Sequence, residues 1–156
     1  MRNLSILFAV VGATHVASAD PPRSHDVGVI GGAGLNISAT GGPQFEVGLH
    51  VRDVVAVSGS ATMMGEWYHA MLAARWFPIE GTWRPYVLAG VGALNQEALF
   101  EDFVVLGVGG EHRSSSGHWA MFGELAVDQP TSASRDSMPA TVRATPYLGL
   151  GVRFYL

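Results

Sequence analysis

Residues 44–52 read QFEVGLHVR, and this stretch decides how the rest of the chain is interpreted. Its apolar residues stand at every second position: Phe45, Val47, Leu49 and Val51. The residues between them, Glu46 and His50 included, are polar or glycine. Successive side chains of a β-strand point to opposite faces, whereas a helix would scatter these apolar residues around its circumference. The stretch therefore predicts a strand with one apolar and one polar face.

The same period of two recurs along the chain and predicts an all-β fold. Eight segments show this alternation: residues 26–38, 44–52, 54–63, 67–77, 84–94, 102–111, 118–128 and 146–156. Turn-forming residues separate the segments, and no low-complexity tract divides the chain. Strands joined in sequence by short turns pair as antiparallel hairpins. We therefore expect an eight-stranded antiparallel up-and-down β-barrel.

The first residues have the order of a secretory signal peptide. Arg2 is followed by an apolar run from Leu4 to Val16, and Ala17-Ser18-Ala19 precedes Asp20. The run is too short to cross a bilayer as a helix, and an A-x-A sequence of this kind marks a cleavage site. The alternative, a buried N-terminal helix, would not need that sequence. We expect a signal peptide at residues 1–19 and one exported barrel domain at residues 20–156.

Composition excludes several functions. The chain has no cysteine, which excludes disulfides, thiolate–metal sites and a cysteine nucleophile. Its nine basic residues are all arginine and form no cluster, and the net charge of −4 argues against nucleic acid as a partner. Charged residues make up 14%, against roughly 25% in an ordinary soluble domain, and the mean hydropathy is +0.24. No apolar run beyond the N-terminus approaches the roughly 20 residues of a membrane helix.

The alternation fits two kinds of barrel. In a soluble barrel of the lipocalin type, the apolar face turns inward around a small apolar ligand. In an outer-membrane barrel the apolar face meets lipid, and polar residues fill the interior. The apolar face of this chain carries no charge in the middle of its segments. The opposite face carries Glu46, Arg52, Arg75, Arg84, Glu111, Glu124 and Arg153.

Three further features favour the membrane barrel. Glycines recur in pairs on the polar face: Gly32/Gly34, Gly90/Gly92, Gly107/Gly109 and Gly149/Gly151. Glycine weakens a strand, but inside a barrel just wide enough for side chains it makes room for larger neighbours. Aromatic residues cluster near segment ends, as in interfacial girdles: Phe45, Trp67, Tyr68, Trp76, Trp83, Trp119, Phe154 and Tyr155. The segments are also about ten residues long, which matches roughly 9–11 residues for a tilted membrane strand.

Two short phrases carry a resemblance to a known family. Residues 84–92 read RPYVLAGVG, and residues 147–156 read YLGLGVRFYL. The first resembles the fifth strand, and the second the terminal strand, of the small eight-stranded outer membrane β-barrel proteins of the opacity, OmpA-like and OmpW-like groups. The family usually ends on Phe, whereas this chain ends Phe154-Tyr155-Leu156.

The resemblance implies a monomer of a Gram-negative outer membrane, with lipid around it and a C-terminal strand that the assembly machinery reads. In such proteins the function usually resides in surface loops. With the N-terminus in the periplasm, the loops at 38–42, 63–66, 95–101 and 128–145 face outside. Loop 128–145 is the longest and is rich in Ser, Thr and Pro, so it is the first candidate for contact with a surface ligand.

The inward charged residues are interpreted as a structural plug. Glu124 and Arg153 lie on neighbouring predicted strands, and Glu46 faces the side of Arg75 and Arg84. Buried charges need such partners. Because eight strands leave no open channel, we do not expect a conduction path.

No catalytic, cofactor-binding or metal-binding residue is expected. His50 and His69 point inward, but no third ligand has a metal-like spacing. His112, Ser114 and Glu124 are similar in order to the Ser-His-Glu triad of lipid A deacylase barrels. Those enzymes continue with Asn after Ser, whereas here a turn follows, and Glu124 faces inward, away from lipid. We expect a structural or surface-interaction role, with a soluble ligand-binding barrel as the alternative and a lipid A-modifying enzyme as a further one.

Overall fold

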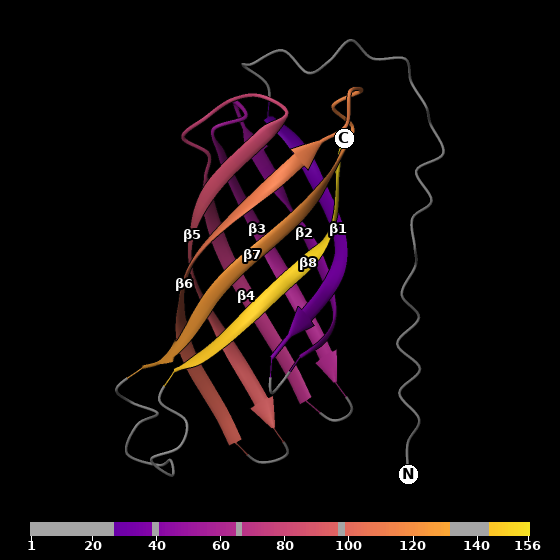
Figure 1. Cartoon of the computed structure of the whole chain (residues 1–156). Helices are drawn as coiled ribbons and strands as arrows, with labels where there is room; N and C mark the ends of the chain where they lie inside the picture. The colour runs from indigo at the N-terminus through magenta and orange to yellow at the C-terminus, as the bar shows by residue number, and fades with distance from the viewer. Residues whose placement is uncertain (1–26, 39–40, 65–66, 97–98, 132–143) are drawn as a thin grey trace.

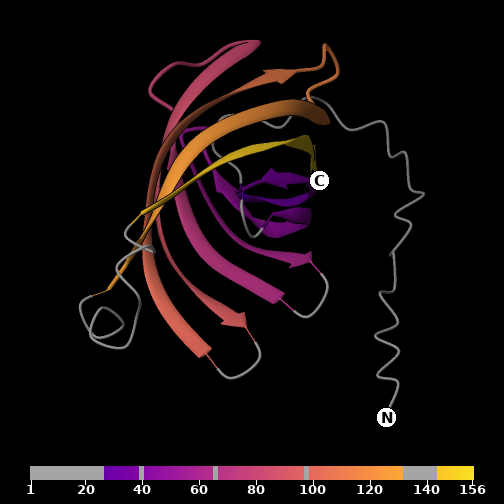
Figure 2. The ribbon, with the colours of Figure 1, turned by 60° about the horizontal axis from the view of Figure 1, so that its bottom comes forward.

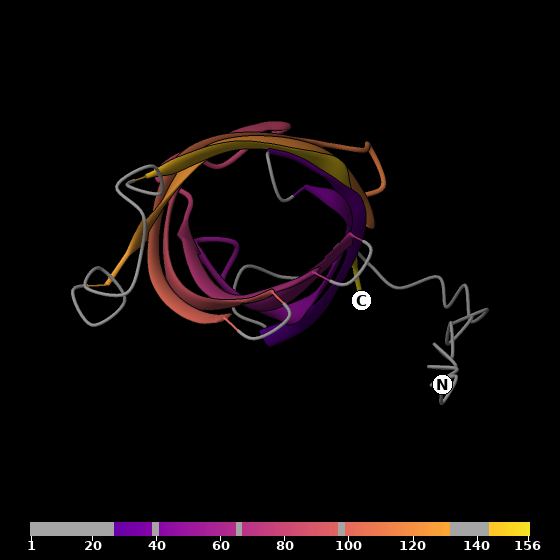
Figure 3. The same cartoon turned by 90° about the horizontal axis from the view of Figure 1, so that it is seen from below.

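The chain forms a closed antiparallel barrel, shown from the side in Figure 1 and from one end in Figure 3. The computed structural model describes residues 27–38, 41–64, 67–96, 99–131 and 144–156. The eight strands are β1 (Val27–Ile37), β2 (Gly42–Val51), β3 (Val55–Met64), β4 (Trp67–Trp76), β5 (Trp83–Gln96), β6 (Leu99–Arg113), β7 (Trp119–Pro130) and β8 (Thr145–Tyr155). Each strand pairs with the next, and β1 pairs with β8. This confirms the predicted all-β, up-and-down barrel.

The predicted segments match the observed strands closely, with the largest difference at β6. This strand begins at Leu99 and ends at Arg113, whereas the sequence pattern predicts residues 102–111. Its inward residues include Phe103 and Val105, so the run from Phe103 to Leu106 is apolar on both faces. Apolar and polar residues therefore do not alternate in this run, so the sequence pattern defines this strand poorly. The predicted signal peptide, residues 1–19, and most of loop 128–145 lie outside the described residues.

The two ends of the barrel differ. At the turn end, uppermost in Figure 1, short connections join β2 to β3, β4 to β5 and β6 to β7, and the C-terminus lies there. The β2–β3 connection is a tight turn in which Arg52 and Asp53 have positive φ values of 54° and 53°, a conformation typical of two-residue hairpin turns. The opposite end is the loop end. Figure 2 shows how strongly the strands tilt as they pass between the two ends.

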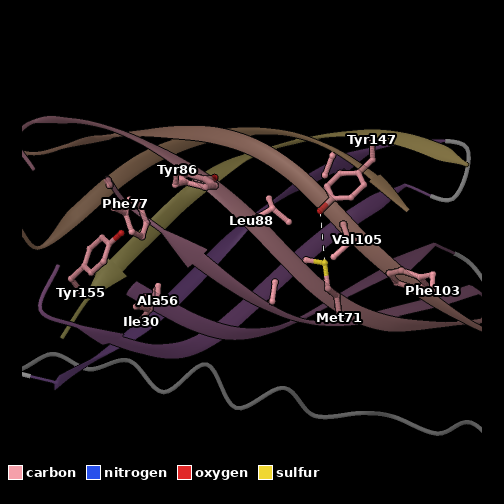
Figure 4. Close-up of a cluster of buried hydrophobic side chains, with 13 residues drawn as sticks. Ile30, Ala56, Met71, Phe77, Tyr86, Leu88, Phe103, Val105, Tyr147 and Tyr155 are labelled. Carbon is pink, nitrogen blue, oxygen red and sulfur yellow. Dashed lines mark hydrogen bonds between the residues drawn. The ribbon is translucent and has the colours of Figure 1, made fainter. Parts of the chain in front are cut away.

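The two faces of the wall are inverted relative to a soluble barrel. Val47 and Leu106 point outward and are each 65% exposed, whereas Arg75 and Glu111 point inward and are 1% and 0% exposed. The lumen is packed with side chains, part of which Figure 4 shows. The orientation expected of a membrane barrel is therefore observed. The inward apolar face that the soluble alternative requires is not.

Two side chains lie elsewhere than the sequence pattern indicated. The alternation within residues 44–52 and 118–128 places Arg52 and His118 on the inward face, but both are exposed in turns at the turn end. The alternation stops where a strand stops, so a residue beyond the last ladder pair no longer follows it. Tyr155 does follow the alternation, since it points inward like Arg153 and is 4% exposed, but it therefore does not belong to the aromatic girdle in which it was predicted. The side chain of Trp67 lies outside the described residues.

The inward glycines make room for bulky neighbours, as predicted. A Cβ added at Gly109 would lie 2.5 Å from Cζ of Tyr86, and one at Gly151 would lie 2.7 Å from a ring carbon of Phe122. Real Cβ atoms do not approach other atoms so closely. The repeated glycines are therefore needed because a narrow lumen filled with rings and guanidinium groups leaves no space for a Cβ at these positions.

Candidate functional site

The middle of the lumen holds a network of charged and polar side chains. Six strands contribute one residue each to this central network: Glu46, Ser58, Arg75, Tyr86, Glu124 and Arg153. On one side, Arg75 Nη1 donates to Glu46 Oε1 over 2.7 Å and to Ser58 Oγ over 2.6 Å. The Ser58 hydroxyl in turn donates to Glu46 Oε1 over 2.6 Å.

Glu124 is the acceptor shared by the other side of the central network. Its Oε2 lies 3.3 Å from nitrogens of both Arg75 and Arg153, and it accepts a 2.9 Å hydrogen bond from the Tyr86 hydroxyl. Arg153 Nε donates to Glu46 Oε2 over 2.9 Å, which closes a ring of two carboxylates and two guanidinium groups. The Arg153 guanidinium also lies 3.8 Å from the ring centroid of Phe122.

A second group, the turn-end cluster, lies closer to the turns. It consists of Asp53, Arg84, Glu111, Arg113 and Tyr155. Glu111 Oε1 lies 3.1 Å from Arg84 and 3.4 Å from Arg113, and its other oxygen accepts a 2.5 Å hydrogen bond from Tyr155. Arg153 Nη1 lies 3.5 Å from Glu111 Oε2, so the two groups are continuous.

The β2–β3 turn inserts a carboxylate into this cluster. Asp53 Oδ1 accepts a 2.8 Å hydrogen bond from Arg113 Nη2, and the Asp53 carbonyl oxygen accepts one from Arg84. Burial by itself would raise the pKa of the Asp53 carboxyl, but the hydrogen bond and charge of Arg113, with the charge of Arg84, lower that pKa below its usual value. Asp53 therefore stays ionised and fixes the turn.

The charges of the two groups balance. Among the described residues, the two groups pair four arginines, Arg75, Arg84, Arg113 and Arg153, with four acids, Glu46, Asp53, Glu111 and Glu124. Removing one member of a buried pair leaves an uncompensated charge, which typically costs about 3–5 kcal/mol. The groups therefore behave as one interlocked plug rather than as separate ion pairs.

An apolar layer lies on the loop-end side of the plug. Figure 4 shows Met71, Leu88, Val105 and Tyr147 between Tyr86 and Phe103 along the barrel. All four are at most 5% exposed, and the Tyr147 hydroxyl lies 3.8 Å from the sulfur of Met71. The layer separates the plug from the polar residues beyond it.

The loop-end mouth is lined by inward polar side chains near the loop-end termini of their strands. Its members are Asn36, Gln44, Thr62, His69 and Asp128. His69 Nε2 lies 3.2 Å from Asp128 Oδ2, and the His69 ring stacks on Phe103 with centroids 4.7 Å apart. The Nε2–Oδ2 approach lacks the alignment of a hydrogen bond, since Nε2 has no hydrogen-bond partner.

The predicted pairs are partly confirmed. Glu124 meets Arg153, and Glu46 meets Arg75, as expected. The expected approach of Arg84 to Glu46 is wrong, because Glu111 stands directly opposite Arg84 in the β5–β6 register and binds it first.

Sequence reasoning missed several polar residues that complete the lumen. The alternation within residues 54–63 and 84–94 places Ser58 and Tyr86 on the inward face, but it does not predict their bonds to the carboxylates. Asp53 and Arg113 were not assigned to the lumen at all. The spacing in β6 could have predicted the position of Arg113, because residues two apart in a strand point to the same face and Glu111 points inward.

The two inward histidines, His50 and His69, lie near opposite ends of the barrel. His50 Nδ1 is 3.8 Å from Asp53 near the turn end, whereas His69 lies in the loop-end mouth. Among the residues that the structure describes, no three His, Cys, Asp or Glu side chains are grouped so as to hold a metal ion.

The three residues of the triad-like pattern are not assembled. The Glu124 carboxylate is in the lumen, bound to Arg75, Arg153 and Tyr86. Ser114 Oγ lies 3.0 Å from Ser116 Oγ in the β6–β7 turn.

The exterior carries a continuous apolar belt with aromatic residues near its ends. Trp76, Trp83, Trp119 and Phe154 lie outward near the turn end, and Phe45 and Tyr68 lie outward near the loop end. All six are at least 40% exposed. Among the described residues, no helix is long and apolar enough to cross a membrane.

The comparison with solved structures agrees with this geometry. No protein-family model and no curated protein matches the chain. A solved structure, the N-terminal beta-barrel domain of Pseudomonas aeruginosa OprF, superposes with a TM-score of 0.64 at 16% sequence identity. The superposition covers 85% of this chain and 98% of the OprF domain. The fold is that of a small eight-stranded barrel. At this identity the likeness to OprF concerns the fold, so function is argued from the residues of this chain.

Proposed function

We propose that the chain is an integral outer-membrane β-barrel protein of a Gram-negative bacterium, with a structural or surface-interaction role and a closed lumen. The observation that carries the proposal is the inversion of the wall, with valines and leucines outside and arginines and glutamates inside. In water such a surface would aggregate, whereas in a bilayer it replaces lipid–lipid contacts. The barrel fold shared with the OprF domain supports the same reading.

The aromatic residues and the sequence supply an orientation. The turn end would face the periplasm and the loop end the outside, with Trp76, Trp83, Trp119 and Phe154 at the inner interface. The predicted signal peptide at residues 1–19 would direct export, and the C-terminal strand β8 would be read by the assembly machinery. The barrel would then be a monomer surrounded by lipid, with loop 128–145 available to a surface ligand.

The lumen supports a closed barrel rather than a pore. The plug satisfies its charges internally, and the apolar layer lies across the path beyond it. An ion would have to separate buried ion pairs and cross the apolar layer, both of which are unfavourable. Catalysis is not proposed, because the acid that a triad would need is committed to the plug.

The test is expression of the full chain in a Gram-negative host, followed by membrane fractionation and electrophoresis. We expect the protein in the outer-membrane fraction, a need for detergent, and faster migration before boiling than after. In planar bilayers the purified barrel should give no steady conductance. Recovery from the soluble periplasm without detergent would overturn the membrane proposal, and a steady conductance would overturn the closed lumen.

A further inference from the structure

The loop-end mouth has buried acceptors with no donors. Asn36 Oδ1, Gln44 Oε1 and Asp128 Oδ1 are buried oxygens without a hydrogen-bond partner. Asn36 and Gln44 are 7% and 3% exposed. A buried polar atom left unpaired costs about 1–3 kcal/mol, so such atoms normally have a partner. Three of them in one region indicate that the described residues of the chain do not supply the partner.

The register brings these residues together. Gln44 stands opposite Thr62, which stands opposite His69 on the next strand. Asn36 is diagonal to Gln44, since Gly34 pairs with Gln44 and Asn36 pairs with Gly42. Asp128 reaches His69 from the other wall of the barrel at 3.2 Å. The mouth is thus lined from β1, β2, β3, β4 and β7.

Within the described residues, the chain places its lumen cations at the other end. Arg75, Arg84, Arg113 and Arg153 all stand within two residues of the turn-end terminus of their strands. The chain has no lysine. The 3.2 Å approach of His69 Nε2 to Asp128 Oδ2 is not a hydrogen bond and leaves the three orphan oxygens without a donor. The described part of the mouth therefore contains no arginine or lysine, its three orphan oxygens are not served by its own amide groups, and it carries the negative charge of Asp128.

We propose that the loop-end mouth binds a small organic cation with N–H donors, of the protonated primary amine class. An ammonium group offers three N–H donors and a positive charge, which complement the carboxylate and the two amide oxygens. Asn36 and Gln44 come from neighbouring strands spaced about 4.8 Å apart, and Asp128 comes from β7 on the other wall, so the acceptors are spread in a way that suits a ligand with several donors better than one metal ion with ligands at about 2.0–2.6 Å. The proposal concerns the lumen and does not depend on where the barrel is located.

The test is isothermal titration of the detergent-folded full chain with 1,4-diaminobutane at neutral pH. Two comparison probes separate the sources of binding: tetramethylammonium has the charge without N–H donors, and calcium chloride supplies a metal ion. We expect saturable binding of the diamine and binding at least about tenfold weaker for tetramethylammonium, because the latter leaves the oxygens unpaired. Calcium should not compete with the diamine.

Two mouth variants and one control sharpen the test. Asp128→Asn should weaken diamine binding about tenfold or more, and Gln44→Leu should weaken it severalfold without removing a charge. Asp102→Asn is the matched control, because Asp102 is an exposed acid on β6 near the same end. It should leave the affinity unchanged. Folding of each variant is verified by its migration before boiling.

Three results would overturn the proposal. One is the absence of saturable diamine binding to the folded chain. Another is equal affinity for tetramethylammonium or calcium, which would make the mouth a general cation site. The third is an equal loss in Asp102→Asn and Asp128→Asn, which would indicate diffuse attraction to the surface. If Asp128→Asn fails to fold, Gln44→Leu decides, since unchanged affinity in that variant equally refutes the site.

Discussion

The two ends of the lumen differ in how far their polar side chains are paired. Toward the turn end, four arginines and four acids compensate one another within a few ångströms. At the loop-end mouth, Asn36, Gln44 and Asp128 each keep an unpaired oxygen. The plug thus pairs its charges internally, although Arg84 Nε, Arg113 Nε and Glu124 Oε1 have no hydrogen-bond partner, whereas the unpaired atoms of the mouth are mainly oxygens that need a donor. A filled barrel can therefore combine a region whose charges are paired internally with a region whose oxygens lack donors.

The difference also explains why charge alone is a poor guide to a site. Glu124 is the most heavily bonded acid of the lumen, and its Oε2 serves two arginines and Tyr86. The charge of this carboxylate is therefore held by the plug, although its Oε1 has no hydrogen-bond partner. Gln44 carries no charge, but its oxygen has no partner in the fold.

The largest expected effect follows from breaking the plug. Glu124→Leu should lower the free energy of unfolding by about 3–5 kcal/mol, because Arg75 and Arg153 lose their shared acceptor. Urea unfolding in lipid vesicles measures the change. Gln44→Leu is the comparison and should be nearly neutral, since it removes a group with no partner.

A double variant separates lost pairing from lost packing. Glu124→Leu with Arg153→Leu should be less destabilised than the sum of the two single variants, because the buried charges are removed together. Additive effects of the two substitutions would mean that the plug is not interlocked.

The next effect concerns the exterior of the same wall. Leu106→Arg places a charge in the middle of the belt, where it should cost about 2–4 kcal/mol in a bilayer. Ser115→Arg, in the exposed β6–β7 turn, is the control and should change little. Unfolding in vesicles distinguishes them, and equal stability of the two variants would contradict a lipid-facing belt.

A smaller effect is expected from crowding the plug. Gly109→Ala places a Cβ 2.5 Å from the Tyr86 ring, which must move away from Glu124, at a cost of about 1–3 kcal/mol. Gly31→Ala is the matched control, because its Cβ would meet nothing within 4 Å. If both variants unfold at the same urea concentration, close packing around Tyr86 is not what the glycine provides.

The smallest effect concerns pH at the turn end. Because the pKa of Asp53 is lowered in the folded barrel, its stabilisation is present above the unfolded value of about 3.9 and is lost as the pH falls through the lower, folded value. Asp53→Asn, which tolerates the positive φ, should cost about 1 kcal/mol at neutral pH. It should also flatten the loss of stability below pH 4, and a variant as acid-sensitive as the parent would contradict this role.

Sequence reasoning reached the fold and the composition of the lumen, but not its contacts. The alternation in QFEVGLHVR correctly assigned Glu46 inward and Val47 outward. It failed at strand ends, where Arg52 and His118 leave the ladder, and in the apolar run Phe103–Leu106, where both faces look alike. The alternation along a strand gives the face to which each side chain points, but it gives no information beyond the last residue that pairs with a neighbouring strand.

Eight strands and most of the side chains that enter the lumen follow from the sequence alone, because the period of two is a local property of an extended backbone. Only the closed tertiary structure decided which of those side chains meet. Closure of β1 on β8 and the register of β5 on β6 bring Glu46 to Arg153 and Glu111 to Arg84, across separations that no local pattern encodes. The same closure leaves three oxygens of the loop-end mouth without donors among the described residues, since Arg75, Arg84, Arg113 and Arg153 all lie nearer the turn-end termini of their strands.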